Sequence, residues 1–207
     1  MLSVSGITSA IYAVMYAIST SLLYPVIFVL ILLVVYSVME TGAFLAESAK
    51  RRRNFEEIRN VNPSNYSEAL KSLEKLRVNW LLREFISELK KLNPNRKDVE
   101  KLLEEYELKM AKELEIPRIL ARIGPMLGLM GTLIPLGPAM IALSQGNIQE
   151  LATNLITAFA TTVLGLIVGG IGYTLFTIKK RWYLEDLSDM DYLARKLEVF
   201  YEEKTDR

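Results

Sequence analysis

Long uncharged runs alternate with strongly charged stretches along this chain of 207 residues. Residues 1–39 carry no charge, and Glu150 is the only charged residue between Arg122 and Lys179. A helix that spans a membrane needs about 20 apolar residues, with a rise of about 1.5 Å for each. The uncharged segments that approach this length are residues 22–38, 123–143 and 151–178. The pattern therefore predicts an all-α integral membrane protein with three spanning helices.

The basic residues predict an orientation for these spans. All 25 Lys and Arg residues lie within residues 40–122 or 179–207, so they share one side of the membrane if the chain crosses it three times. Cytoplasmic segments of membrane proteins carry an excess of Lys and Arg. We therefore expect the N-terminus outside and the C-terminus in the cytoplasm.

This orientation divides the chain into consecutive segments with distinct surroundings. The predicted order is an outer-surface amphipathic helix (1–21), the first span (22–46), a cytoplasmic helical region (47–117), the second span (118–143), an outer loop (144–150), the third span (151–178) and a cytoplasmic C-terminal helix (179–207). A cleaved signal peptide is the rival interpretation of the first segment, which lacks a positive n-region. Glu150 is expected to cap the third span, since a carboxylate is favourable at a helix N-terminus.

Prolines predict where the helices end. Pro25 should break the first uncharged run, because proline inside a helix removes a hydrogen bond. The steps Asn62-Pro63 and Asn93-Pro94 should each end a helix, since the residue before proline avoids the α region. The resulting cytoplasmic helices lie near 65–92 and 95–120, with a bend at 115–117.

The composition excludes several classes of chemistry. The chain has no cysteine and no histidine, which rules out disulfides, zinc fingers and a Ser-His-Asp triad. It also has no glycine-rich phosphate loop and no strand pattern. We therefore predict that the protein is not an enzyme and uses no cofactor or metal.

Small and hydroxylated residues form a stripe on each of the last two spans at 100° per residue. On the third span these residues are Asn154, Thr157, Ala158, Thr161, Thr162, Gly165, Gly169 and Gly172; on the second they are Gly124, Gly128, Gly131, Thr132, Pro135, Ala139 and Ala142. Two interpretations stay open. The stripes are helix-packing surfaces of the small-xxx-small type, or they line a path for water or ions. No titratable residue lies in mid-membrane, so a proton path would need a carboxylate from another polypeptide.

Two motifs carry a family resemblance. The run Ile123-Gly-Pro-Met-Leu-Gly-Leu-Met-Gly-Thr132 resembles the second-span motif P-x-L-G-L-x-G-T of the MotA/TolQ/ExbB proton channel family. The run Thr161-Thr-Val-Leu-Gly-Leu166 is similar to the third-span motif A-T-x-x-G-L. The order of spans, cytoplasmic insert and short outer loop also matches. With three spans and a short insert, the chain is closer to TolQ/ExbB than to MotA, which has four spans.

The resemblance implies a stator subunit in the inner membrane of a prokaryote. Five copies would surround the single spans of a dimeric TolR/ExbD-like partner, which supplies the proton-binding Asp. Ion flow would then be converted into mechanical work or protein transport. The residues assigned to the pore are Thr132, Thr162, Thr161 and Thr157, and those assigned to packing of the pore helices are Gly128, Gly131, Pro135, Gly165 and Gly169.

One departure from the family bears on the driving ion. TolQ and ExbB carry a Glu five residues before the third-span threonine, where this chain has Thr157. The resemblance therefore leaves open a proton gradient, a sodium gradient or a weakly conducting form. The alternative function is a membrane scaffold or passive transporter subunit that uses its stripes for packing alone.

Overall fold

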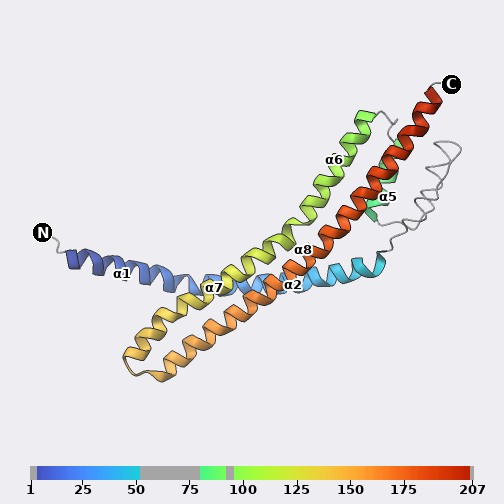
Figure 1. Cartoon of the computed structure of the whole chain (residues 1–207). Helices are drawn as coiled ribbons and strands as arrows, with labels where there is room; N and C mark the ends of the chain where they lie inside the picture. Colours follow the sequence, from blue (N-terminus) through green and yellow to red (C-terminus); the bar gives the residue numbers. More distant parts are fainter. Residues whose placement is uncertain (1–3, 52–79, 92–95, 206–207) are drawn as a thin grey trace. The chain divides into compact units, whose positions relative to one another are not determined.

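The computed structural model describes residues 4–51, 80–91 and 96–205, and every regular element in this part of the chain is an α-helix. In chain order the helices are α1 (Val4–Ser21), α2 (Leu23–Lys50), α5 (Trp80–Lys91), α6 (Arg96–Glu113), α7 (Glu115–Ser144) and α8 (Ile148–Thr205) (Figure 1). The helix ends predicted at Asn62-Pro63 and Asn93-Pro94, and the start of the predicted helix 65–92, lie outside the described residues.

Three helical stretches are long and apolar enough to cross a membrane. They are Ala13–Ala49, Asp98–Ser144 and Ile148–Arg195. The all-helical fold with three candidate spans is therefore confirmed for the described residues. The direction in which the chain crosses the membrane stays a prediction.

The helices belong to two compact units. The first contains α1, α2 as far as Gly42, α7 from Ile116 and α8 as far as Phe176. The second contains the end of α2 from Ala43, then α5, α6 and α8 from Thr177 onward. The uncharged segments belong to the first unit and most of the charged helices to the second.

The break in the first apolar run lies at Leu22 and not at Pro25. The Leu22 amide donates to the carbonyls of both Ile18 and Ser19, at 3.2 Å each, and α1 ends there. Pro25 is the third residue of α2. Amides in the first turn of a helix have no partner within the helix, so the missing N–H of Pro25 is tolerated there.

The bend predicted at 115–117 is a single-residue break at Leu114, between α6 and α7. The Leu114 amide donates to the Ala111 carbonyl at 3.2 Å, one residue short of the α-helical pattern. Beyond this break, Pro125, Pro135 and Pro138 all lie inside α7.

The turn between α7 and α8 ends in a reciprocal cap. Gly146 has a φ of 72°, a conformation that glycine adopts at no steric cost. The Glu150 amide donates to the Asn147 side-chain oxygen at 3.1 Å, and the Asn147 amide group donates to the Glu150 carboxylate at 2.9 Å. Asn147 is therefore the cap residue, and Glu150 lies in the first turn of α8 and supports the cap through the Asn147 side chain.

Candidate functional site

The two small-residue stripes meet each other within one chain, in the first unit. The buried positions of α7 from Gly124 onward are Gly124, Gly128, Gly131, Pro135, Ala139 and Ala142. The buried positions of α8 in this unit include Ala158, Thr161, Gly165, Gly169 and Gly172. On the other side of α8, Phe159 and Leu166 are exposed. Lipid or further helices can cover this bulky face, whereas the small faces are used in the α7–α8 contact.

The contact is close because glycines face each other across it. A Cβ atom built on Gly165 would lie 2.7 Å from the Gly128 Cα and 2.6 Å from the Gly124 carbonyl oxygen. A Cβ built on Gly169 would lie 2.5 Å from the Pro125 ring. Backbone atoms cannot move aside as a flexible side chain can. The glycines at 128, 165 and 169 therefore set the distance between the two helices.

Thr132 and Thr162 come together where the stripes cross. Their hydroxyls are hydrogen-bonded to each other. Each also donates to a carbonyl four residues back in its own helix, Thr132 to Gly128 at 3.0 Å and Thr162 to Ala158 at 3.1 Å. The Thr132 hydroxyl also lies 3.4 Å from the Ala158 carbonyl oxygen, and the Thr162 hydroxyl 3.5 Å from that of Gly128, so two hydroxyl hydrogens are shared among five contacts. The oxygen lone pairs that remain can accept from a further donor. Both residues are half-buried.

The other two predicted path residues are arranged differently. Thr161 is buried. A Cβ built on Gly131 would lie 2.6 Å from both the Cβ and the hydroxyl oxygen of Thr161. Its hydroxyl bonds the carbonyls of Thr157 at 3.1 Å and Ala158 at 2.9 Å, within its own helix. The Thr157 hydroxyl donates to the Thr153 carbonyl at 3.1 Å. Of the four predicted hydroxyls, the structure thus pairs Thr132 with Thr162 across the two helices.

A second polar cluster, which the sequence did not predict, joins the end of α2 to α8 in the second unit. Arg51 forms an ion pair with Asp186 at 2.7 Å and donates to the Trp182 carbonyl at 2.9 Å. The guanidinium carbon lies 4.8 Å from the centre of the Trp182 ring, which stacks on Phe44. Arg51 and Asp186 are 135 residues apart in sequence. No local spacing signals such a pair.

Burial perturbs the acids of this cluster. Desolvation raises the pKa of Asp186 to about 6, and the favourable charge of Arg51 offsets only part of that rise. Burial also raises the pKa of the Tyr183 hydroxyl, and the charges of Glu47 and Glu113 raise it further. Glu47 itself lies 3.8 Å from the Lys179 ammonium on α8. Among the described residues, no group of three or more acidic side chains is placed to hold a metal ion.

The fold and these contacts define a class of protein before any comparison is made. Three apolar helices, and a hairpin with paired hydroxyls whose only charge between Arg122 and Lys179 is Glu150, are typical of a multi-pass membrane protein. Residues 67–191, more than half of the chain, match the model of the MotA/TolQ/ExbB proton channel family. The chain belongs to this family. No curated protein matches it. Membership implies a non-enzymatic channel or stator subunit of a complex driven by the proton-motive force, acting with a TolR-, ExbD- or MotB-like partner.

Proposed function

We propose that this chain is a TolQ/ExbB-type subunit whose hydroxyl pair, Thr132 and Thr162, contacts the transported ion. The observation that carries the proposal is the pairing of these hydroxyls across two helices that are otherwise held by glycine contacts. Polar groups in hydrocarbon are costly unless they pack on protein or line water. An oxygen that keeps free lone pairs can accept from a hydrated proton or coordinate a small cation.

The proposed assembly is a pentamer in the inner membrane of a prokaryote, with the N-terminus outside. Its α7 and α8 helices surround the spans of a dimeric TolR/ExbD-like partner. Between Ile123 and Ile178 the chain has a single acid, Glu150, at the outer turn. The proton-binding carboxylate in mid-membrane must therefore come from the partner. Ion passage then moves the subunits around the partner and performs mechanical work or transport.

We propose the TolQ/ExbB type because the sequence predicts three spans and a short cytoplasmic insert. The driving ion is proposed to be the proton, and Thr157 is the position at which this can be tested. A Thr157→Glu variant supplies the acid that TolQ and ExbB carry. If the native path is weakly conducting for lack of this acid, the variant raises proton flux in reconstituted vesicles, measured with a pH-sensitive dye trapped inside.

The test of the hydroxyl pair replaces Thr132 or Thr162 by Val, which keeps the shape and removes the hydroxyl. Thr174→Val is the matched control, because Thr174 is exposed on α8 and its hydroxyl bonds only the Gly170 carbonyl of its own helix, at 2.9 Å. We expect the path variants to assemble with the partner and lose roughly tenfold or more in ion flux, the effect of a polar contact worth about 1–3 kcal/mol. The control should conduct like the wild type.

The scaffold function is the second candidate, and the burial of Thr161 against Gly131 favours it, because there a hydroxyl serves packing alone. The first measurement is the mass of the complex purified in detergent together with single-span membrane proteins of the same cell. Five copies holding two copies of a partner with an intramembrane Asp support the motor. A chain that stays without such a partner, and whose Thr→Val variants behave like the wild type, is a scaffold.

A further inference from the structure

The second unit has an open groove between α6 and α8. Its volume is about 460 Å³, within the range of about 300–1,000 Å³ that is typical of binding pockets. The apolar part of its lining is Leu103 from α6 with Leu184 and Leu187 from α8. Leu184 is 58% exposed, so the groove presents apolar surface that nothing in the described chain covers.

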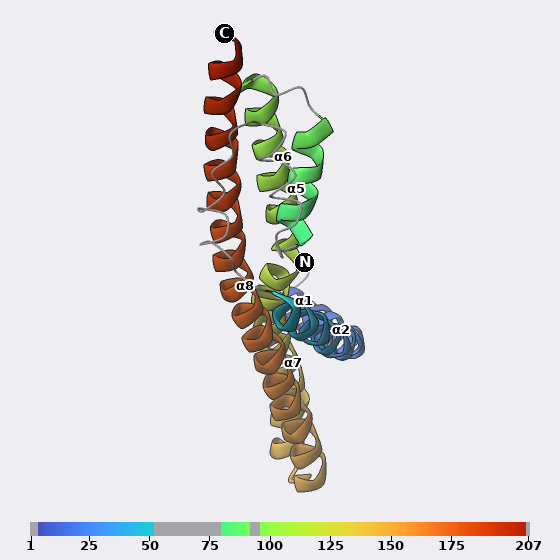
Figure 2. The same cartoon turned by 90° about the vertical axis from the view of Figure 1, so that its right-hand side faces the viewer.

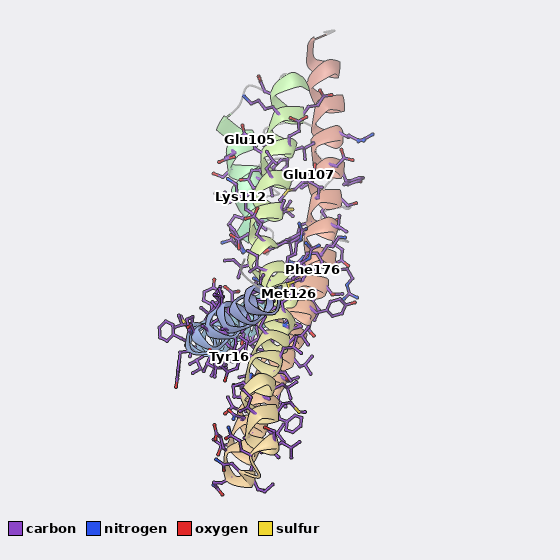
Figure 3. All side chains as sticks on the ribbon, turned by 90° about the vertical axis from the view of Figure 1, so that its left-hand side faces the viewer. Tyr16, Glu105, Glu107, Lys112, Met126 and Phe176 are labelled. Carbon is purple, nitrogen blue, oxygen red and sulfur yellow. The ribbon has the colours of Figure 1, made fainter. Side chains whose placement is uncertain are left out.

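The rim of this groove carries an excess of negative charge. Glu104 and Glu107 line it from α6, and both are exposed. Figure 3 shows Glu107 on the side of α6 that faces α8. From α8 come Asp191 and Arg195, which neutralise each other, since the Arg195 Nε lies 3.1 Å from both Asp191 carboxylate oxygens. The two glutamates are therefore left to attract a cationic partner.

The exposed face of α5 carries an aromatic and a basic side chain, which complement the apolar groove and its acidic rim. Trp80 is 48% exposed, although the Lys109 ammonium of α6 lies 5.4 Å from the centre of its ring, and Arg83, one turn further along the helix, is exposed as well. The opposite face of α5, with Leu81 and Phe85, is fully buried. An exposed indole beside an exposed guanidinium matches an apolar groove with an acidic rim, and Trp and Arg are the residues most enriched at interface hot spots.

Figure 2 shows α5 and α8 on different sides of α6, so the α5 face and the groove between α6 and α8 both adjoin α6. Phe85 contacts Tyr106 edge to face, and Glu84 pairs with Lys109 at 2.6 Å, which places α5 beside residues 106–109 of α6. Glu107 is the neighbour of Tyr106, so the end of the groove at Glu107 lies within about one helical turn of this level. It is also turned about 100° around α6 from the side that contacts α5.

A cyclic ring built from head-to-tail contacts needs two different patches on each copy, at the same level along the ring axis. A head-to-tail contact repeats around the ring only if one copy's first patch meets the next copy's second patch without a shift along the axis. We infer that the Trp80–Arg83 face of α5 docks into the α6–α8 groove of a neighbouring copy, with Trp80 on the three leucines and Arg83 at Glu104 and Glu107. This inference rests on the proposed ring and names a contact that holds it together.

The absence of native cysteine makes disulfide trapping a direct test. Full-length chains carrying Arg83→Cys and chains carrying Glu107→Cys are produced together in the same membranes with different tags and oxidised mildly. Glu105→Cys is the matched control, because it is exposed on the same turn of α6 but on nearly the opposite side. A disulfide requires Cβ atoms about 3.5–4.5 Å apart, so we expect a yield of mixed dimer roughly tenfold higher with Glu107→Cys than with the control.

The mass of the unmodified complex, measured in detergent, separates the two ways in which the experiment can fail. A multi-copy ring with equal cross-linking at 107 and 105 overturns the docking contact and leaves the proposed function standing. Single-copy particles overturn the ring, and the contact with it. A charge exchange gives an independent check. Glu107→Arg should shift the complex toward smaller species, and adding Arg83→Glu should restore the ring, whereas a purely structural role of Glu107 would give no restoration.

Discussion

The α7–α8 contact of the first unit and the α5–α6 contact of the second solve the same packing problem with opposite residues. Between α7 and α8, glycines bring two backbones together, as at Gly128 and Gly165. Between α5 and α6, large side chains fill the space, with Phe85 fully buried against Tyr106 and a ring-centre distance of 5.3 Å. The α7–α8 contact depends on the absence of side chains at its glycines, and the α5–α6 contact depends on the burial of large side chains.

We attribute the difference to the surroundings proposed for each helix pair, lipid for α7 and α8 and water for α5 and α6. In a membrane, lipid tails are as apolar as leucine, so burying large apolar side chains gives little advantage and helices associate by close backbone approach. In water, burial of a large apolar side chain stabilises by about 1.5–3 kcal/mol. The α7–α8 contact should therefore be disrupted by larger side chains, and the α5–α6 contact by smaller ones.

The largest effect is expected where atoms are added to the glycine contact. Gly165→Leu would drive a side chain into the Gly124 carbonyl and the Gly128 Cα, so we expect the α7–α8 hairpin to be lost. Gly170→Leu is the control, since a Cβ there meets nothing within 4 Å. The measurement is the yield of protease-resistant chain in the membrane fraction. Equal yields for the two variants would show that the close contact is not essential.

Removing atoms should be most costly in the second unit. Phe85→Ala empties a fully buried site and is expected to lower the free energy of unfolding by about 4 kcal/mol. Leu108→Ala, at a position 63% exposed on α6, should change it by less than about 1 kcal/mol. Both tryptophans, Trp80 and Trp182, belong to this unit, so fluorescence during denaturation reports on it. A small effect of Phe85→Ala would contradict the role of burial here.

The sequence predicts the faces of the α7–α8 contact but not the ion pair of Arg51 with Asp186. The spacing of small residues predicts which faces of α7 and α8 are small, because helical periodicity is local. It leaves packing and an ion path equally open, and only coordinates show that the Thr132 and Thr162 hydroxyls meet. The ion pair of Arg51 with Asp186 joins residues 135 positions apart, and nothing in either neighbourhood signals it. Local pattern predicts elements and faces, whereas pairing across the chain depends on tertiary structure.

The buried ion pair gives the second unit a pH dependence between pH 4 and 6. The pKa of Asp186 is raised from 3.8 to about 6, so between these values the folded chain holds a proton that the unfolded chain has lost. This group stabilises the folded state below pH 4, and that contribution of about 3 kcal/mol is lost as the pH rises through 6.

The measurement compares unfolding of the wild type and Asp186→Asn at several pH values between 4 and 7, followed by Trp182 fluorescence. The wild type should lose stability relative to the variant as the pH rises. Asp189 and Glu185 lie near Asp186 and are unchanged in both proteins, so the difference isolates one carboxyl group. A wild type that gains stability over this range would mean that Arg51 outweighs the cost of burial.

The smallest effect is expected at the exposed ion pair of Asp191 and Arg195. Both residues lie on α8, where Asp186 forms its buried pair with Arg51 from the end of α2. The side chains of Arg195 and Asp191 are 77% and 46% exposed, against 11% and 9% for Arg51 and Asp186. A double-mutant cycle with Asp191→Asn and Arg195→Gln should give a coupling of about 0.5 kcal/mol. In about 1 M salt, where charges are screened beyond roughly 3 Å, this coupling should vanish.

The cycle on Arg51 and Asp186 should keep most of its coupling in the same salt, because burial excludes the screening ions. If both cycles respond alike, the C-terminal end of α2 is held on α8 by the stacked rings of Phe44 and Trp182 and not by charge.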